Sequence, residues 1–204
     1  SELPAGTEYK INEDGFFPNG NFTFSDNFSS QKLNYRWISV RGPHEDFTTS
    51  TKEGLLIKPF NINIKDALPT STLFHRQQHI SFTATTTMKY IPQSEKDLAG
   101  ITCYQSEGFN YLFGVTKSNN RYYLLLQRTE NGESSVIESI EINPKHKLKL
   151  QVKADGDKYW FNFSENDDEF INLGGVVSGD ILSTNVAGGF TGSPFLTTEA
   201  LPAW

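Results

Sequence analysis

The clearest pattern of hydrophobic and polar positions runs from residue 147 to residue 163. In its first half every second residue is apolar and the positions between are lysine or glutamine; the apolar residues are Leu148, Leu150, Val152 and Ala154. Asp155-Gly156 supplies a turn, after which Tyr159, Phe161 and Phe163 repeat on alternate positions. A period of two is typical of a strand with one buried face, so this segment predicts a β-hairpin.

A second alternating stretch, from Leu73 to Thr87, predicts the strand around which the rest of the chain is organised. In its second half one side is apolar, with Ile80, Phe82 and Ala84, and the other side is polar. The inward parity continues back through Arg76 and Gln78, which would need hydrogen-bond partners if they were covered. For Arg76 we favour a buried arginine paired with an acidic neighbour.

Further short strands are predicted at intervals of about ten residues, and no segment has a helical period. They cover residues 21–27, 35–41, 54–58, 100–105, 111–116, 121–128 and 135–141, with one more beginning at Phe170. Turns rich in glycine and asparagine, such as Asn131-Gly132, separate them. This arrangement predicts an all-β fold, an antiparallel two-sheet β-sandwich or jelly roll. Because Pro194 has no N–H to donate, the closing strand is predicted to be an edge strand or to be bulged.

Composition narrows the domain organisation and the partners. Residues 1–22 are rich in proline, glycine and polar groups, which predicts a linker or an extended N-terminal arm before one sandwich domain over residues 23–204. The net charge is −6 and the basic residues are scattered, which argues against a nucleic-acid or an anionic-membrane partner. No apolar run approaches the roughly 18 residues of a membrane span. Cys103 is the single cysteine and is predicted to be a buried, inert thiol.

The histidines do not predict a metal site. His75 and His79 are four residues apart, which would suit zinc on a helix, but on a strand they would stand roughly 13 Å apart. With one cysteine and only His44 and His146 besides, zinc is not expected. Sequons at Asn21, Asn27 and Asn162 would be used only along a eukaryotic secretory route and decide nothing here.

An acidic segment offers the main catalytic alternative. Residues 165–169 contain Glu-x-Asp-x-Glu, and some sandwich glycosidases place such carboxylates on one strand face as nucleophile and acid/base. There the intervening residues are apolar, whereas here they are Asn166 and Asp168. We therefore interpret the segment as a solvated hairpin loop and keep hydrolysis by Glu165 and Glu169 as a remote alternative. Calcium binding by the loop carboxylates is a second alternative, because hard cations take oxygen ligands.

Several short segments, in a shared order, resemble one known domain family. Arg76-Gln77-Gln78-His79 followed by Phe82 resembles an "RRQQH-x-x-F" strand, and residues 99–105, AGITCYQ, resemble "A-G-L-x-x-Y-Q". Matches of the same kind are Asp26-Asn27-Phe28, the segment from Leu33 to Arg41, the Ala154-Asp155-Gly156 hairpin and Gly189-Phe190-Thr191-Gly192. Together they resemble the C-terminal β-sandwich domain of glycoside hydrolase family 43 enzymes of the β-xylosidase and arabinofuranosidase type.

This resemblance implies a concanavalin A-like sandwich that packs on a catalytic five-bladed propeller of the same parent chain. The catalytic carboxylates of the family lie on the propeller, so the resemblance implies that this chain has no catalytic residue and needs no cofactor. It also implies that the "F-T-G" turn, here Phe190 and Thr191, lines the rim of the substrate pocket; a core position for Phe190 is the alternative. The expected location is secreted or periplasmic.

The sequence thus predicts a non-catalytic accessory domain that braces a propeller and shapes its pocket during plant-polysaccharide breakdown. The alternative is an independent carbohydrate-binding module that contacts oligosaccharide itself, because aromatic side chains are abundant and serve as stacking platforms for sugars. Besides Phe190 and Thr191, the candidate sugar-contacting or interdomain residues are Arg76, Gln78, Gln105 and Asn110.

Overall fold

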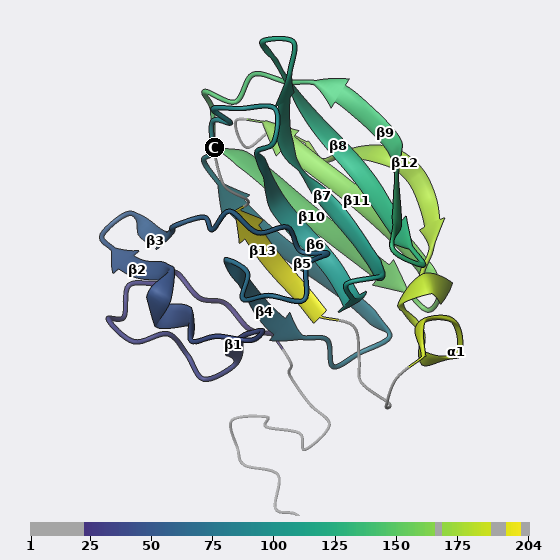
Figure 1. Cartoon of the computed structure of the whole chain (residues 1–204), viewed down its shortest axis with the longest axis horizontal. Helices are drawn as coiled ribbons and strands as arrows, with labels where there is room; N and C mark the ends of the chain where they lie inside the picture. Colours follow the sequence, from purple (N-terminus) through teal and green to yellow (C-terminus); the bar gives the residue numbers. More distant parts are fainter. Residues whose placement is uncertain (1–22, 166–168, 189–194, 201–204) are drawn as a thin grey trace, which may run out of the picture.

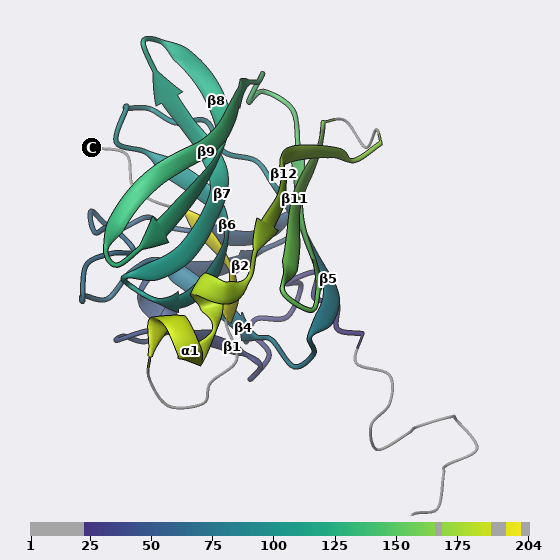
Figure 2. The same cartoon turned by 90° about the vertical axis from the view of Figure 1, so that its right-hand side faces the viewer.

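The computed structural model describes residues 23–165, 169–188 and 195–200, the last range by its backbone alone. These residues form a seven-stranded and a four-stranded antiparallel sheet, stacked as two layers, with a small two-stranded sheet beside them (Figures 1 and 2). The predicted two-sheet β-sandwich is therefore confirmed. Within this part of the chain, no helix has the length and hydropathy of a membrane span.

The larger sheet has the strand order β1-β4-β13-β6-β7-β8-β9. Its strands are β1 (Trp37–Ser39), β4 (Thr72–Arg76), β13 (Phe195–Ala200), β6 (Leu98–Ser106), β7 (Phe109–Ser118), β8 (Arg121–Glu130) and β9 (Glu133–Glu141). The smaller sheet has the order β12-β11-β10-β5, with β12 (Ile171–Ser178), β11 (Lys158–Glu165), β10 (Leu148–Asp155) and β5 (Ser81–Met88). The remaining elements are β2 (Thr48–Thr51), β3 (Gly54–Ile57), the 3-10 turns η1 (His44–Asp46) and η2 (Asp180–Leu182), and the one-turn helix α1 (Thr184–Ala187).

The hydrophobic core lies between the two large sheets. Alternate residues of β10 and β11 point into it, as the sequence pattern predicted, and Leu150, Val152 and Phe161 are completely buried. The Phe161 ring contacts those of Tyr111 and Phe113 from the other sheet, with centroid separations of 5.5 and 5.6 Å. These contacts join the layers, because the two sheets bury their facing sides against each other.

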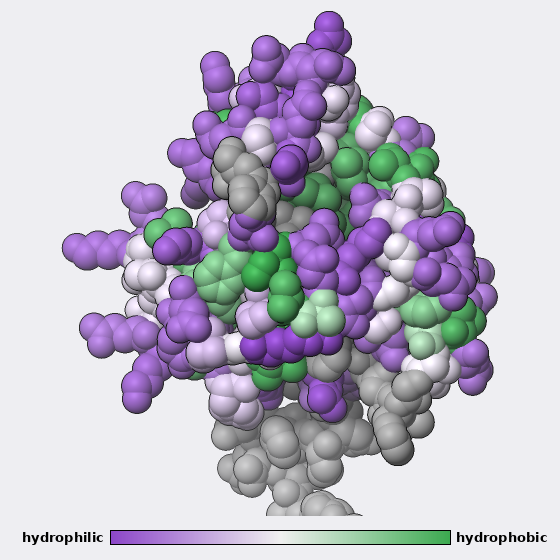
Figure 3. All heavy atoms as spheres, viewed as in Figure 1, coloured by the Kyte–Doolittle hydropathy of each residue, from purple (hydrophilic) through white to green (hydrophobic). Residues whose placement is uncertain are grey.

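A second, smaller cluster covers the outer face of the larger sheet. It consists of Ile64, Phe74 and Tyr104, and the rings of Phe74 and Tyr104 lie 5.2 Å apart. The irregular segments around β2 and β3 lie on this side of the sheet, where hydrophilic side chains surround smaller hydrophobic areas (Figures 1 and 3). Phe74 and Tyr104 are therefore buried on the face of the larger sheet that points away from the main core.

The expected single strand from Leu73 to Thr87 is wrong. The chain forms β4 in one sheet and β5 in the other, with a crossing segment at residues 77–80. Within it the Gln77 side chain donates to the His79 carbonyl, and Ile80 is 77% exposed although its parity predicted burial. Arg76 ends β4 as an exposed residue, so the expected buried arginine is also wrong. The period of two that we read along this stretch continues through residues 77–80, so it does not show that the chain changes sheets there.

The predicted strand at 21–27 is wrong over its described residues, which form no strand. Asp26 and Asn27 instead accept hydrogen bonds from backbone N–H groups two residues ahead, a local arrangement that competes with a ladder. The segment is held by other means: Trp37 Nε1 donates to Asp26 Oδ2 at 2.8 Å, and the Phe24 ring stacks on His75 at 4.8 Å. The predicted strand at 35–41 is reduced to the three residues of β1.

The closing strand is not at an edge. β13 lies between β4 and β6 and pairs with both, without a register shift in either pairing. Pro194 precedes the first paired residue, Phe195, so its missing N–H removes nothing from the ladder. The predicted strands from residue 98 onward are otherwise confirmed, and so is the burial of Cys103, which raises the pKa of its thiol. β2 was not predicted.

Candidate functional site

The candidate loop residues Phe190 and Thr191 lie outside the described residues, but both ends of their loop are placed. On the N-terminal side, the Gly188 carbonyl lies 3.5 Å from Gln105 Nε2, at the limit of a hydrogen bond. On the C-terminal side, Phe195 pairs with Arg76 of β4 and with Tyr104 of β6. The loop therefore starts and ends beside two of the predicted site residues, Gln105 and Arg76.

Gln105 reaches this position because β6 is irregular there. The register with β7 shifts between Tyr104 and Ser106, which leaves Gln105 without a direct partner across the strand pair. Such a bulge changes the direction of a side chain at a sheet end and is a recurrent device next to binding sites. Another candidate, Gln78, lies in the crossing segment that follows Arg76, and its side chain is exposed.

Asn110 is placed differently from the other candidates. Its side chain is fully buried, and its Nδ2 donates to the carbonyls of Ser106 and Glu107, each at 3.2 Å. These bonds close the turn between β6 and β7. Asn110 thus sits within the turn that supports this end of the sheet, and Gln105, Gln78 and Arg76 are the candidates on the surface.

The structure adds an ion pair to this corner that the sequence analysis did not identify as part of a site. Arg41 Nη2 contacts Glu107 Oε1, and Arg41 has a left-handed backbone with φ of 63°. Burial raises the pKa of the neighbouring Tyr104 hydroxyl to about 12, so it remains protonated at neutral pH. Burial opposes ionisation of Glu107, but its backbone N–H and Arg41 outweigh burial and lower its pKa.

This corner is suited to shaping and binding rather than to hydrolysis of a glycoside. Cleavage with two carboxylates requires one protonated acid and one base or nucleophile on either side of the bond. Here the Glu107 carboxylate is paired with Arg41, and Tyr104 is held as a neutral hydroxyl. The sequence offered one signal for this corner: Arg41 and Tyr104 lie in the family-like segments 33–41 and 99–105. Nothing in those segments indicates that the two residues lie close together.

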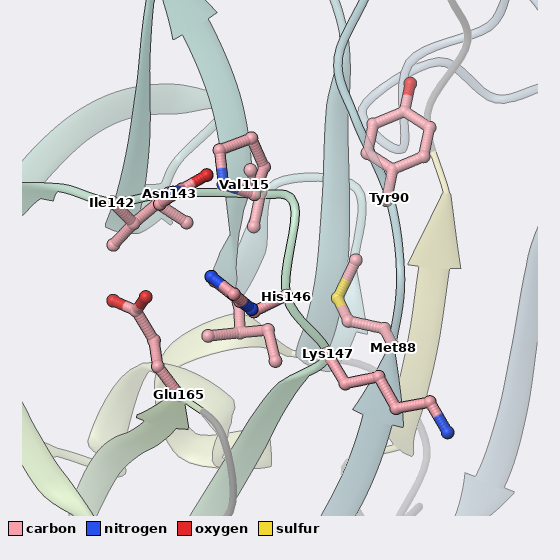
Figure 4. Close-up of a pocket in the computed structure, with 10 residues that line it drawn as sticks. Met88, Tyr90, Val115, Ile142, Asn143, His146, Lys147 and Glu165 are labelled. Carbon is pink, nitrogen blue, oxygen red and sulfur yellow. The ribbon is translucent and has the colours of Figure 1, made fainter.

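The acidic segment around Glu165 lies at the end of β11, and residues 166–168 are outside the described ranges. Glu165 borders a cavity of about 10 Å³, together with Met88, Tyr90 and His146. In Figure 4 the Glu165 carboxylate and the His146 ring point toward the same space. A volume of that size admits about one water molecule and is far too small for a sugar ring. Glu169 is exposed.

The described residues contain no group of three or more histidine, cysteine or acidic side chains placed to hold a metal ion. His75 is half-buried on β4, the second strand of the larger sheet, where it packs against the rings of Phe24 and Trp37, and burial lowers its pKa. His79 lies in the crossing segment beyond the end of β4. The two histidines thus have separate surroundings.

Comparison with known proteins places this geometry in a family. Residues 25–195 match the model of the β-xylosidase C-terminal concanavalin A-like domain. The chain is 25% identical over 169 residues to a non-reducing end α-L-arabinofuranosidase of Bacteroides ovatus, which covers 82% of this chain and 32% of the relative.

Solved structures agree with the family match. A GH43_12 protein retrieved from a capybara gut metagenome superposes with a TM-score of 0.85 and 37% identity, over 99% of this chain and 39% of that one. The xylan β-1,4-xylosidase of Bacillus halodurans shares the fold with a TM-score of 0.76 at 16% identity, over 93% of this chain and 40% of that one. The chain thus spans about a third to two fifths of these relatives, and it belongs to the family of C-terminal concanavalin A-like domains of GH43 enzymes.

Proposed function

We propose that this chain is the non-catalytic accessory domain of a longer GH43 glycosidase, and that it braces a five-bladed catalytic propeller and shapes its substrate pocket. The observation that carries the proposal is the extent of the match: relatives align along nearly this whole chain, and the chain fills only 39% of the capybara-gut protein. The remaining length in such relatives is where a catalytic domain belongs. The parent enzyme is proposed to be secreted or periplasmic.

The position of the loop ends supports the pocket-shaping part of the proposal. A loop that leaves Gly188 and returns at Phe195 is anchored at both ends on one end of the larger sheet. Loops on a rigid sheet are the usual carriers of binding residues. An aromatic side chain at position 190 would add an apolar wall to a sugar pocket formed mainly by the partner domain.

The substrate class is proposed from the relatives alone. One relative is an α-L-arabinofuranosidase and another a xylan β-1,4-xylosidase. We therefore propose that the parent enzyme removes arabinose or xylose residues from the ends of plant polysaccharide chains or their fragments.

The test compares the longer enzyme containing this chain with its Phe190→Ala variant on chromogenic arabinofuranosides and xylosides. We expect kcat/KM on the preferred substrate to fall about tenfold or more, because without the Phe190 ring the substrate is positioned less precisely for reaction. Phe170→Ala is the matched control, since Phe170 is a partly exposed aromatic immediately before β12, at the opposite end of that strand from the segment that leads to Gly188. Equal kinetics for the two variants would contradict a pocket role for the loop.

Two other outcomes would favour the alternatives. If deleting the domain slowed hydrolysis of polysaccharide but not of small chromogenic substrates, the chain would act as a carbohydrate-binding module. If the 204-residue chain alone turned over a chromogenic glycoside and Glu169→Gln abolished that activity, hydrolysis by Glu165 and Glu169 would replace the accessory role.

A further inference from the structure

The outer face of the four-stranded sheet carries an organised set of polar and aromatic side chains. Along β10 and β11 the residues Val152 and Phe161 are buried in the core, so their neighbours Lys153 and Trp160 point outward. In Figure 2 the strands β5, β11 and β12 form one layer, and no other labelled element lies on its outer side. We call this surface the Trp160 face; it comprises the outward residues of β5, β10, β11 and β12.

A hollow of about 360 Å³ opens on the Trp160 face, near the turn between β10 and β11. It is lined by Ser81, Phe82, Thr83, Lys153, Ala154, Asp155 and Trp160. Thr83, Lys153 and Trp160 lie directly opposite one another across three strands. The half-buried Trp160 is the outward aromatic of the lining, and the exposed Lys153 lies between it and Thr83. Ser81 Oγ donates to Asp155 Oδ1 at 2.7 Å, which fixes a carboxylate at the end of the hollow.

The next row of outward side chains is a continuous chain of amides. Asn172 Nδ2 donates to Asn162 Oδ1 at 3.0 Å, and Asn162 Nδ2 donates to Gln151 Oε1 at 3.2 Å. Gln151 Nε2 in turn donates to Thr85 Oγ1 at 3.2 Å. These bonds run in one direction across all four strands, so each one polarises and orients the next.

The amide row is built to bind further groups. A primary amide has two N–H donors and two acceptor lone pairs, and this ladder uses one N–H of each amide. The second N–H of Asn162 and of Gln151, and one lone pair on each carbonyl oxygen, are left to serve a ligand above the sheet. Paired donors and acceptors at fixed positions match vicinal hydroxyl groups, because each hydroxyl both donates and accepts.

The Trp160 face carries few charges, and they are of both signs. Its two central rows have Lys153 as their one charged side chain; Asp155 lies beside Lys158 in the row at the turn, and Lys149 lies in the row beyond the amides. A divalent cation would need several oxygen anions, and a nucleic acid would need a cluster of basic side chains. An aromatic wall beside hydroxyl-binding amides suits the apolar face and the hydroxyl edge of a sugar ring.

We propose that the Trp160 face binds a neutral pyranose chain. Trp160 packs against one ring in the hollow, with Asp155 and Ser81 at its hydroxyl edge, and the amide row binds the hydroxyls of the next residue. Adjacent rows of a strand face are separated by roughly 6.6 Å, a spacing on the scale of one sugar residue. This site is additional to the proposed pocket-shaping role, since neither Phe190 nor a propeller takes part in it.

The test is a titration of the 15N-labelled 204-residue chain with xylohexaose, followed by NMR and by calorimetry. We expect the Trp160 indole N–H signal and the side-chain amide signals of Gln151, Asn162 and Asn172 to shift together. Trp160→Ala should weaken binding about tenfold or more. Tyr35→Ala is the matched control, because Tyr35 is an aromatic residue that is 85% exposed and belongs to the turn before β1.

Several results would overturn the proposal. One is the absence of shifts with xylohexaose at millimolar concentration; another is binding that Trp160→Ala leaves unchanged. The Trp37 indole signal reports whether Trp160→Ala remains folded, and Gln151→Ala gives a second variant with an expected several-fold loss. The same titration on the longer enzyme must also shift the Trp160 signal. If it does not, the face is covered by another domain and the proposal is wrong.

Discussion

At the scale of single residues, Asp97 shows how one side chain organises a loop. It is completely buried in the connection between β5 and β6. Its Oδ2 accepts from the backbone N–H of Gln93 at 2.6 Å and from the Tyr90 hydroxyl at 3.2 Å, and its Oδ1 accepts from the Ser94 hydroxyl at 2.6 Å. Burial alone would raise its pKa, but these hydrogen bonds outweigh burial and lower it.

The Asp97→Asn variant should lower the free energy of unfolding by about 1–3 kcal/mol at pH 7, because one buried oxygen that accepts hydrogen bonds becomes an NH₂ donor. A carboxyl with a depressed folded pKa stabilises the fold above its unfolded pKa of about 3.9, and this contribution is lost as the pH falls through the folded pKa. The variant should therefore show a weaker loss of stability on acidification. Urea denaturation between pH 3 and 7 measures both effects.

Asp66→Asn is the control for this prediction. Asp66 Oδ2 accepts one hydrogen bond, from the Asn63 backbone in an exposed turn, and the change should fall within about 0.5 kcal/mol. If the two variants behaved alike, the Asp97 network would not be the source of the stability.

At the scale of elements, β6 and β7 approach unusually closely where two glycines face each other. Gly100 lies opposite Gly114 across the strand pair. A Cβ on Gly100 would lie 2.0 Å from the Phe113 carbonyl oxygen, and one on Gly114 would lie 2.5 Å from that of Ala99. Because the clashing atoms are backbone, rotation of a side chain would not relieve them.

Gly100→Ala should therefore lower the free energy of unfolding by about 3 kcal/mol or more, since the two strands must separate to admit one methyl group. Gly108→Ala is the matched control in the turn between the same strands, where the nearest atom to a new Cβ is 3.4 Å away. Chemical denaturation of both variants gives the comparison. A cost for Gly100→Ala no larger than that for Gly108→Ala would refute the close approach.

At the scale of the whole molecule, buried tyrosines couple the fold to alkaline pH. Burial raises the pKa of Tyr104, Tyr111 and Tyr159 to about 12 in each case. Tyr111 also bridges the sheets, because its hydroxyl donates to the Ser178 carbonyl at 2.8 Å. Unfolding would release all three hydroxyls to their ordinary pKa of about 10.

Stability should consequently fall as the pH rises from 10 to 12. A group with a raised folded pKa contributes stability that is complete below its unfolded pKa and is lost as the pH rises through the folded pKa, because only the unfolded chain ionises in between. Denaturation curves from pH 8 to 12, with tyrosinate absorbance followed in parallel, measure this loss. Tyr111→Phe removes one of the three groups and should flatten the dependence; an unchanged slope would count against it.

Much of the fold was predictable because it depends on local pattern. Strict alternation from residue 147 to residue 163 predicted β10 and β11, and Asn131-Gly132 predicted a hairpin whose two residues have φ of 52° and 81°. Both signals arise within a few residues, where side-chain direction and backbone preference are set by the residues themselves. The family resemblance likewise depended on short segments in order.

The tertiary structure decided what depends on distant partners. The alternation of polar and apolar residues does not indicate which sheet a strand joins. The crossing between β4 and β5 and the position of β13 between β4 and β6 therefore depend on long-range pairing. The ion pair of Arg41 with Glu107, the burial of Asn110 and the hollow beside Trp160 each require segments far apart in the chain to meet. The sequence by itself determined most strands, the tight turns and the family; the packing of two sheets determined which polar side chains are buried and which are exposed on a sheet face.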